Sequence, residues 1–294
     1  MHLLMLLATV CWSANIIAGK DALTAMSSVA VAHLRVLAPA IVYAVAFLLT
    51  GRWRRLAWTR RSLLLVVLSA ASIAVNQLGF IGGMSRSTVA HTGLIVAIGP
   101  VLVLAIAVIL RLETLTPGKV AGVAIAFAGM GLLTSDKLGN GSSGLWLGDL
   151  MLLGSTLAFA FYTIFVKEVA DQYDALSLNT LIFVPAALMM SPFCAHSLAV
   201  TNWGGLGLQA WGGLGFLIVL GTVLPFLLYS YVMTELSASR AAAFNYLQPL
   251  IAIALGFWLL AEPLTSRVLI GGPLILGGVY LAERERGEEK AARS

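Results

Sequence analysis

The stretch GPVLVLAIAVILRLETLTPGKVAGVAIAFAG (99–129) has a counterpart in QPLIAIALGFWLLAEPLTSRVLIGGPLILGG (248–278), and this pair decides the fold. Each stretch carries a proline at its second position, a glutamate 13 residues later and two glycines seven residues apart. The matched residues, all offset by 149 positions, are Pro100 and Pro249, Glu113 and Glu262, Leu115 and Leu264, Thr116 and Thr265, Gly122 and Gly271, and Gly129 and Gly278. Chance readily matches Leu, Ala and Val in apolar sequences, but not Pro, Glu, Thr and paired Gly together. The sequence therefore predicts an internal repeat.

The composition of the whole chain indicates a membrane protein. Of its 294 residues, 60% are hydrophobic and 11% are charged, whereas soluble domains average about 25% charged residues. The basic residues cluster between the apolar runs, as in membrane proteins, which argues against nucleic acid as a partner. Cys11 and Cys194 lie in apolar segments without metal-ligand spacing. We therefore expect an all-α integral membrane protein without a metal or cofactor.

Ten apolar runs are long enough to be transmembrane helices, since a bilayer core of about 30 Å needs about 20 residues per helix. The predicted spans are 3–21, 29–50, 62–82, 88–110, 118–134, 147–166, 176–194, 209–232, 241–260 and 267–283. The predicted organisation is a first repeat at 1–138, a Gly-rich linker at 139–146, a second repeat at 147–283 and a solvated cytoplasmic tail at 284–294.

The number of helices and the distribution of basic residues set the topology. Five predicted helices precede the second repeat, and because five is odd, the second copy enters the membrane from the opposite side. Such an inverted repeat favours transport by alternating access. Thirteen Lys and Arg residues share one side, and five the other, if both termini are cytoplasmic. We expect a multi-pass protein of the bacterial cytoplasmic (inner) membrane, for which a monomer is sufficient.

The chain resembles the EamA type of the drug/metabolite transporter (DMT) superfamily over nearly its whole length. The resemblance rests on residues 12–20, Arg35 in the second predicted helix, and residues 100–113 and 242–262. Within that superfamily the chain looks most like the YddG-type exporters of aromatic amino acids. The resemblance implies ten helices, cytoplasmic termini and a central cavity between the halves. It implies export of aromatic and other neutral amino acids, although these motifs are poorly specific for substrate.

Two prolines within predicted helices indicate kinks. Pro100 and Pro249 each lack an N–H group and clash with the carbonyl four residues earlier, which exposes that oxygen to a cavity. Asn245, Tyr246 and Gln248 lie on the second of these turns, where amides suit the carboxylate and ammonium of an amino acid. The alternative is that these polar side chains only hold helices together.

Aromatic residues on repeat-related helices are further candidates for substrate binding. Trp12 and Asn15 share a face of the first predicted helix, and Phe159 and Tyr162 share a face of the sixth. The repeat superposes Trp12 on Phe159 and Asn15 on Tyr162. These faces could sandwich a substrate side chain, or the aromatic residues could be ordinary interface anchors. The lower-ranked candidates are Asn76, Phe80 and Tyr229.

Ionisable residues inside apolar segments are costly and carry a functional hypothesis by default. Arg35 could bind a substrate carboxylate or serve a structural role, and His91 is a candidate proton acceptor. Every acidic residue falls at the end of a predicted helix, in a loop or in the tail. Because no carboxylate is then available in mid-membrane, we predict facilitated export, with proton coupling as the alternative.

Two other functions compete with amino acid export. A multidrug or other small-metabolite exporter of the same superfamily would also use a cavity of amides and aromatic rings. An intramembrane enzyme would need a nucleophile with a base or a metal site, and the sequence contains no HExxH, no GxSxG and no acidic pair within a predicted span. The expected partners are amino acid substrates and membrane lipids.

Overall fold

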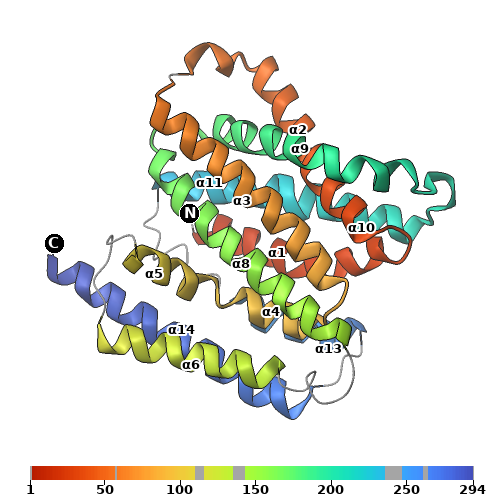
Figure 1. Cartoon of the computed structure of the whole chain (residues 1–294). Coiled ribbons are helices and arrows are strands. Elements are labelled where there is room, and N and C mark those ends of the chain that lie inside the picture. Colours follow the sequence, from red (N-terminus) through yellow and green to blue (C-terminus); the bar gives the residue numbers. More distant parts are fainter. Residues whose placement is uncertain are drawn as a thin grey trace.

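The computed structural model describes residues 2–56, 58–109, 116–134, 143–235, 247–260 and 264–293, and these are helical apart from the turns that join them (Figure 1). The helices of the first half are α1 (His2–Leu23), α2 (Ser28–Leu49), α3 (Arg60–Met84), α4 (Val89–Val96), α5 (Gly99–Ile109) and α6 (Pro117–Thr134). Those of the second half are α8 (Ser143–Val169), α9 (Ala175–Ala199), α10 (Leu208–Ile218), α11 (Leu224–Glu235), α13 (Leu247–Leu260) and α14 (Ser266–Arg293). The all-helical prediction is confirmed for the described residues.

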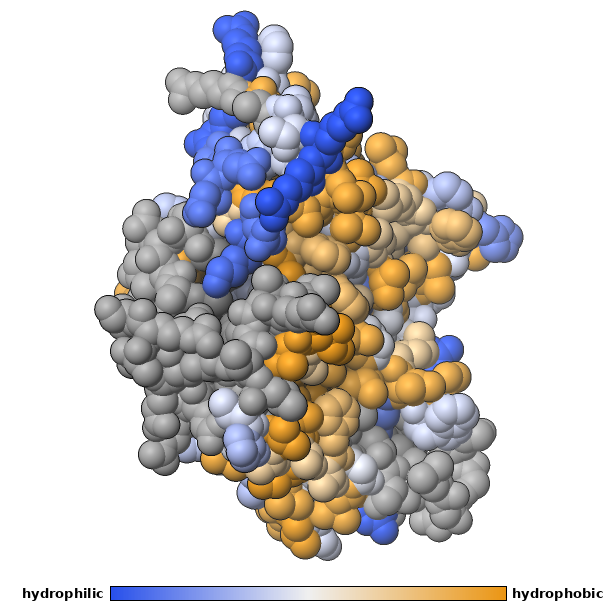
Figure 2. Space-filling view, turned by 60° about the vertical axis from the view of Figure 1, so that its left-hand side comes forward, coloured by the Kyte–Doolittle hydropathy of each residue, from blue (hydrophilic) through white to orange (hydrophobic). Residues whose placement is uncertain are grey.

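Six helical segments of the described chain are long and apolar enough to cross a membrane. They are Leu3–Leu23, Ser28–Leu49, Arg60–Met84, Trp146–Val169, Ala175–Ala199 and Leu208–Val232. Shorter apolar helices occupy 91–106, 120–129 and 266–278. Large apolar side chains also face outward, with Phe193 at 81% and Leu208 at 90% exposure. The face of the molecule drawn in Figure 2 has a broad apolar surface, with hydrophilic side chains gathered toward the ends of the molecule. A chain with such an exterior is a multi-pass membrane protein.

Side-chain caps explain where several helices begin. Thr59 and Ser62 form a capping box at the start of α3, in which each side chain accepts a bond from the other residue's backbone N–H. The Thr88 hydroxyl accepts a bond from the His91 amide at the start of α4. Asp174 caps α9 through the amides of Leu176 and Ser177.

Three segments differ from their predicted form. α8 begins at Ser143, so residues 143–146 of the predicted linker are helical. α14 continues to Arg293 through the predicted tail, whose Glu, Arg, Lys and Ala residues all favour helix. The fourth predicted span is divided into α4 and α5 directly before Pro100.

The helices pack in pairs that join the two halves of the chain. α3 packs on α8, α1 packs on α10 and α11, α2 packs on α9, and α6 packs on α14. The last pair lies side by side at the bottom of Figure 1. Helices α1, α2, α8, α9 and α11 therefore meet in the middle of the molecule, where the largest buried apolar cluster lies.

Glycine backbones meet where α6 crosses α14. A Cβ atom added at Gly129 would lie 2.9 Å from the carbonyl oxygen of Gly271. A Cβ atom added at Gly278 would lie 2.5 Å from the carbonyl oxygen of Gly122. These four glycines are the ones that the internal repeat matches at an offset of 149 residues. Their lack of a side chain is what lets the two helices approach this closely.

Candidate functional site

A π-helical turn, η3 (Val219–Val223), separates α10 from α11 and creates unusual hydrogen-bonding needs. Pro225 has no N–H group, so the Gly221 carbonyl, four residues earlier, cannot receive the usual helical bond. Arg35 on α2 meets this need, because its Nη2 atom donates to the Gly221 carbonyl at 3.2 Å. The Tyr43 hydroxyl donates to the Val223 carbonyl at 2.8 Å. π-turns inside α-helices are frequent at functional sites.

Arg35 is held on three sides within this turn. Its Nε atom donates to the Thr222 hydroxyl at 3.0 Å, and its guanidinium lies over the Phe80 ring, 5.1 Å from the centroid. The residue is 3% exposed. Its Nη1 atom is buried and has no hydrogen-bond partner among the described residues. A buried cation with an unused donor favours an anionic group beside it.

Asn15 on α1 approaches the same turn from the other side. It is 1% exposed, and its Oδ1 atom has no hydrogen-bond partner in the described part of the chain. A Cβ atom added at Gly221 would lie 2.5 Å from this oxygen, so the amide lies directly against Gly221. The turn therefore brings an unused cationic donor and an unused acceptor together, each buried and each from a different helix.

Five aromatic side chains form a cluster next to this turn: Trp12 on α1, Phe159 and Tyr162 on α8, and Phe226 and Tyr229 on α11, called the aromatic cluster below. The Trp12 ring lies 5.7 Å from Phe226, 5.5 Å from Tyr229 and 6.2 Å from Phe159, measured between centroids. Edge-to-face and tilted geometries of this kind are favourable for aromatic pairs. Trp12 and Phe159 are half-buried, whereas the other three rings are buried.

The cluster and the polar turn adjoin along two helices. On α1, Trp12 precedes Asn15 by about one turn, and on α11, Phe226 follows η3 directly. The candidate site thus has a polar end, formed by Asn15, Arg35 and Thr222, and an aromatic end. It draws on α1 and α2 from the first half and on α8, η3 and α11 from the second.

The remaining predicted residues lie elsewhere. The Asn76 amide donates to the Ser155 carbonyl and hydroxyl, both at 3.0 Å, and so joins α3 to α8. Gln248 is half-buried, and it and Pro249 lie at the beginning of the described part of α13. Asn245 and Tyr246 lie outside the described residues.

His91 lies beside a buried carboxylate. Asp149, near the start of α8, is 2% exposed. Its Oδ2 atom lies 3.4 Å from the His91 Nδ1 atom, and its Oδ1 atom accepts a bond from the Ser87 hydroxyl at 2.6 Å. This carboxylate lies near a helix end, so the prediction of facilitated export, which concerned carboxylates in mid-membrane, stays a prediction.

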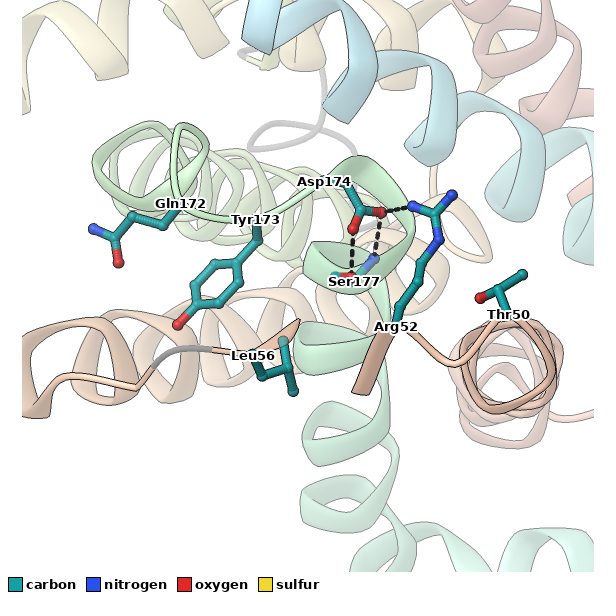
Figure 3. A pocket seen from close by; sticks show the side chains of 7 residues that line it. All are labelled: Thr50, Arg52, Leu56, Gln172, Tyr173, Asp174 and Ser177. Atoms are coloured by element: carbon teal, nitrogen blue, oxygen red, sulfur yellow. Dashed lines mark hydrogen bonds and ion pairs between the residues drawn. The ribbon is translucent and has the colours of Figure 1, made fainter. Parts of the chain in front are cut away.

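A pocket of about 430 Å³ lies apart from this site, between the end of α2 and the turn from α8 to α9 (Figure 3). Arg52, in the 3-10 helix η1 (Arg52–Arg55), forms an ion pair with Asp174 there, and Asp174 also accepts the Ser177 hydroxyl at 2.6 Å. Partial burial alone raises the pKa of the Asp174 carboxyl, but the bonds from Ser177 and the Arg52 guanidinium outweigh it and lower that pKa. These contacts fix a loop and show no feature of a binding site.

Several important residues were missed from the sequence. Phe226 precedes Tyr229 by three residues and could have been placed on its face. Pro225, four residues after Gly221, was the signal for a carbonyl that needs another donor. No sequence signal identified Thr222 or Tyr43 as the partners of that turn, because their roles depend on how α2 packs.

Comparison with known proteins gives a consistent result. The sequence profile of the EamA-like transporter family matches residues 1–135 and again residues 146–283. An uncharacterized transporter of Archaeoglobus fulgidus is 27% identical over 94% of this chain and 95% of its own length. A solved crystal structure with 18% identity superposes with a TM-score of 0.66 over 95% of both chains, which concerns the fold alone.

Two more distant relatives have more specific names. One is named a probable amino-acid metabolite efflux pump of Escherichia coli, 24% identical over 58% of each chain. The other is named a probable terminal-alkyne amino-acid exporter of Streptantibioticus cattleyicolor, 23% identical over 65% of this chain and 63% of its own.

Proposed function

The chain belongs to the EamA-like transporter family, and from that premise we propose that it exports aromatic and other neutral amino acids by alternating access. The observation that carries the proposal is the pairing of the polar turn with the aromatic cluster. An amino acid has a carboxylate for the free Arg35 donor, an ammonium for the free Asn15 acceptor, and a side chain for the aromatic rings. Both atoms are buried, so leaving them unpaired costs free energy that a zwitterion would recover.

The proposal includes a ten-helix architecture of two inverted repeats. Its support is the pattern of helix pairs. Exchanging the two repeats turns the pair α3–α8 into the pair formed by α1 with α10 and α11. The same exchange leaves the pairs α2–α9 and α6–α14 unchanged. A two-fold axis in the membrane plane requires that pattern. The double match of the family profile, once in each half, supports the same division.

Further parts of the proposal follow from the distribution of basic residues and from the architecture. The chain lies in a bacterial cytoplasmic membrane with both termini in the cytoplasm, and it acts as a monomer and a carrier, without enzymatic activity. In that orientation the pocket at Arg52 faces the cytoplasm and His91 lies near the outer side.

The test is uptake of labelled amino acids into proteoliposomes that contain the purified protein, with empty liposomes as the blank. Phenylalanine should be taken up in a saturable manner and compete with other neutral amino acids. Phenethylamine and 3-phenylpropionate, which keep the ring but lose one charge each, should compete at least tenfold less well, which corresponds to about 1.4 kcal/mol for one lost ionic contact.

Matched variants separate the site from the rest of the protein. Trp12→Ala should reduce uptake at least tenfold, whereas Trp211→Ala, at an exposed ring on α10, should leave it unchanged. Arg35→Met should reduce phenylalanine uptake at least tenfold, and Arg54→Met, at a cation that stacks on the Trp53 ring, serves as its control. Equal effects of the paired variants would refute the assignment of the site.

A drug or another small metabolite is the second candidate substrate, because aromatic rings with few charges also suit neutral or cationic drugs. If no amino acid enters the liposomes while a lipophilic cation does, the amino acid proposal is wrong and this candidate replaces it. Equal competition by phenethylamine and phenylalanine would point in the same direction, since it would show that the carboxylate is not recognised.

A further inference from the structure

A second polar cluster is buried at one end of the bundle, separate from the candidate substrate site. The Asp149 carboxylate lies between the Ser87 hydroxyl at 2.6 Å and the His91 ring nitrogen at 3.4 Å. The Lys20 ammonium donates to the Ser87 carbonyl at 2.9 Å. Asp149 is 2% and His91 8% exposed. An ionised carboxylate this deeply buried requires a positive partner or strong donors.

The cluster connects the two halves of the chain. Lys20 lies near the end of α1, Ser87 in the turn before α4, and His91 in the first turn of α4, whereas Asp149 belongs to α8. Ten residues of α8 separate Asp149 from Phe159, so the cluster lies about 15 Å along the helix from the aromatic cluster. A movement that opened the substrate site toward this end by separating α4 from α8 would also separate His91 from Asp149.

We propose that His91 and Asp149 form a proton-binding site, and that the proton bound there holds the two halves closed at this end. When the halves are in contact, a protonated imidazole gains the attraction of the carboxylate in a medium of low dielectric constant. When the halves separate, water solvates both groups and most of that attraction is lost. By linkage, a proton that gains more in the closed form than in the open form favours the closed form.

Histidine is the side chain suited to this role, because its ordinary charge change falls between pH 5 and 8. Acidification of the compartment at this end should thus favour closure, and alkaline conditions should favour opening. In the proposed orientation that compartment is the outer one, so substrate release would slow as the medium becomes acidic.

Among the described residues, other charged groups on the elements around His91 include Lys20, whose ammonium donates to the Ser87 carbonyl. From α1, Asp21 accepts the Gln209 amide at 2.7 Å, and from the turn after α3, Arg86 donates to the Gly82 carbonyl at 2.9 Å. Arg267 lies in the first turn of α14, which packs on α4, and α13, which also packs on α4, has no titratable residue in 247–260. We therefore assign the pH response to His91.

The test measures closure directly and requires no substrate. Spin labels are placed at Thr24 and Leu147, both exposed and on opposite halves, after Cys11 and Cys194 are replaced by serine. The distance distribution between the labels is recorded by electron–electron resonance in nanodiscs from pH 8 to pH 5.5. The ratio of the short to the long distance should rise about tenfold on acidification, which corresponds to a coupling of about 1.4 kcal/mol between proton binding and closure.

Three variants decide the outcome. His91→Gln and Asp149→Asn should each remove the pH response, whereas His196→Gln, at an exposed histidine near the end of α9, should keep it. A distance distribution that does not change with pH in the parent protein overturns the proposal. So does a response that persists in both His91→Gln and Asp149→Asn. Because the readout is a distance, a failure of amino acid transport would leave this test unaffected.

Discussion

Replacing Gly278 with alanine should destabilise the protein, because the new methyl group would meet backbone atoms. It would lie 2.5 Å from the Gly122 carbonyl oxygen and 2.5 Å from the Ala126 amide nitrogen. Ordinary non-bonded contacts are about 3.5 Å, so α6 and α14 would have to separate by about 1 Å. No rotamer change can relieve the clash, since both obstructing atoms belong to a helix backbone.

The expected size of the effect follows from this geometry and from a neighbouring control. Overpacking of a well-packed interface costs about 1–3 kcal/mol. Alanine also gains up to about 1 kcal/mol over glycine in a helix, and Gly277→Ala isolates that gain, because a Cβ atom there has nothing within 4 Å. At about 2 °C per kcal/mol, the Gly278→Ala variant should melt about 2–6 °C below Gly277→Ala.

The assay is thermal unfolding of the purified protein in detergent, followed by tryptophan fluorescence. Gly129→Ala should behave like Gly278→Ala, since its Cβ would lie 2.9 Å from the Gly271 carbonyl oxygen. The double variant should lose less than the sum of the two, because one separation of the helices accommodates both methyl groups. If Gly278→Ala melts at the same temperature as Gly277→Ala, the close approach of the backbones is refuted.

Three other substitutions have definite expected results. Asn76→Ala should lower the melting temperature because α3 loses its side-chain hydrogen bonds to Ser155 of α8, at a cost of about 1–3 kcal/mol, without changing the KM of transport; a raised KM would assign Asn76 to the substrate site. Tyr43→Phe should cost about 1 kcal/mol in unfolding experiments because the Val223 carbonyl loses its donor, and an unchanged melting temperature would contradict this bond. Asp174 has a lowered pKa in the folded protein, so its ionised form stabilises the fold above the pKa of the unfolded state, and this stabilisation is lost as the pH falls through the pKa of the folded state. The variant Asp174→Asn keeps the cap. The difference in melting temperature between the parent and Asp174→Asn should therefore shrink from pH 6 to pH 3, and a constant difference would exclude this linkage.

Much of the fold could be predicted from the sequence, because hydropathy and chain length report directly on membrane helices. The matched glycines were visible as a repeat, and they lie where α6 crosses α14. The start of α8 was placed too late, because glycine and serine at 141–144 are typical of a linker and the packing of α8 on α3 was not visible. The burial of Asp149 and its contact with His91 depend on how α8 packs on α4, which helical periodicity does not report.

The candidate site was only partly predictable. Spacing along single helices placed Trp12 with Asn15 and Phe159 with Tyr162, because the helical period determines which residues share a face. The bond from Arg35 to Gly221 depends on a π-turn, and whether a proline produces a simple kink or a π-turn depends on tertiary packing. Interhelical partners such as Ser155 for Asn76 are likewise determined by helix register, which periodicity does not report.

The contact between α6 and α14 has the form of a homodimer interface within one chain. Gly129 meets Gly271 and Gly278 meets Gly122, so each position contacts the repeat-equivalent of its partner. That reciprocity is the rule for an isologous two-fold dimer, in which one patch is complementary to itself. If the two halves have the proposed inverted topology, a half-length ancestor inserted in both orientations would already have possessed this contact, and gene fusion would have preserved it while freeing the two copies to diverge. The divergence of Asn15 from Tyr162, at equivalent positions of the two copies, is what such freedom produces.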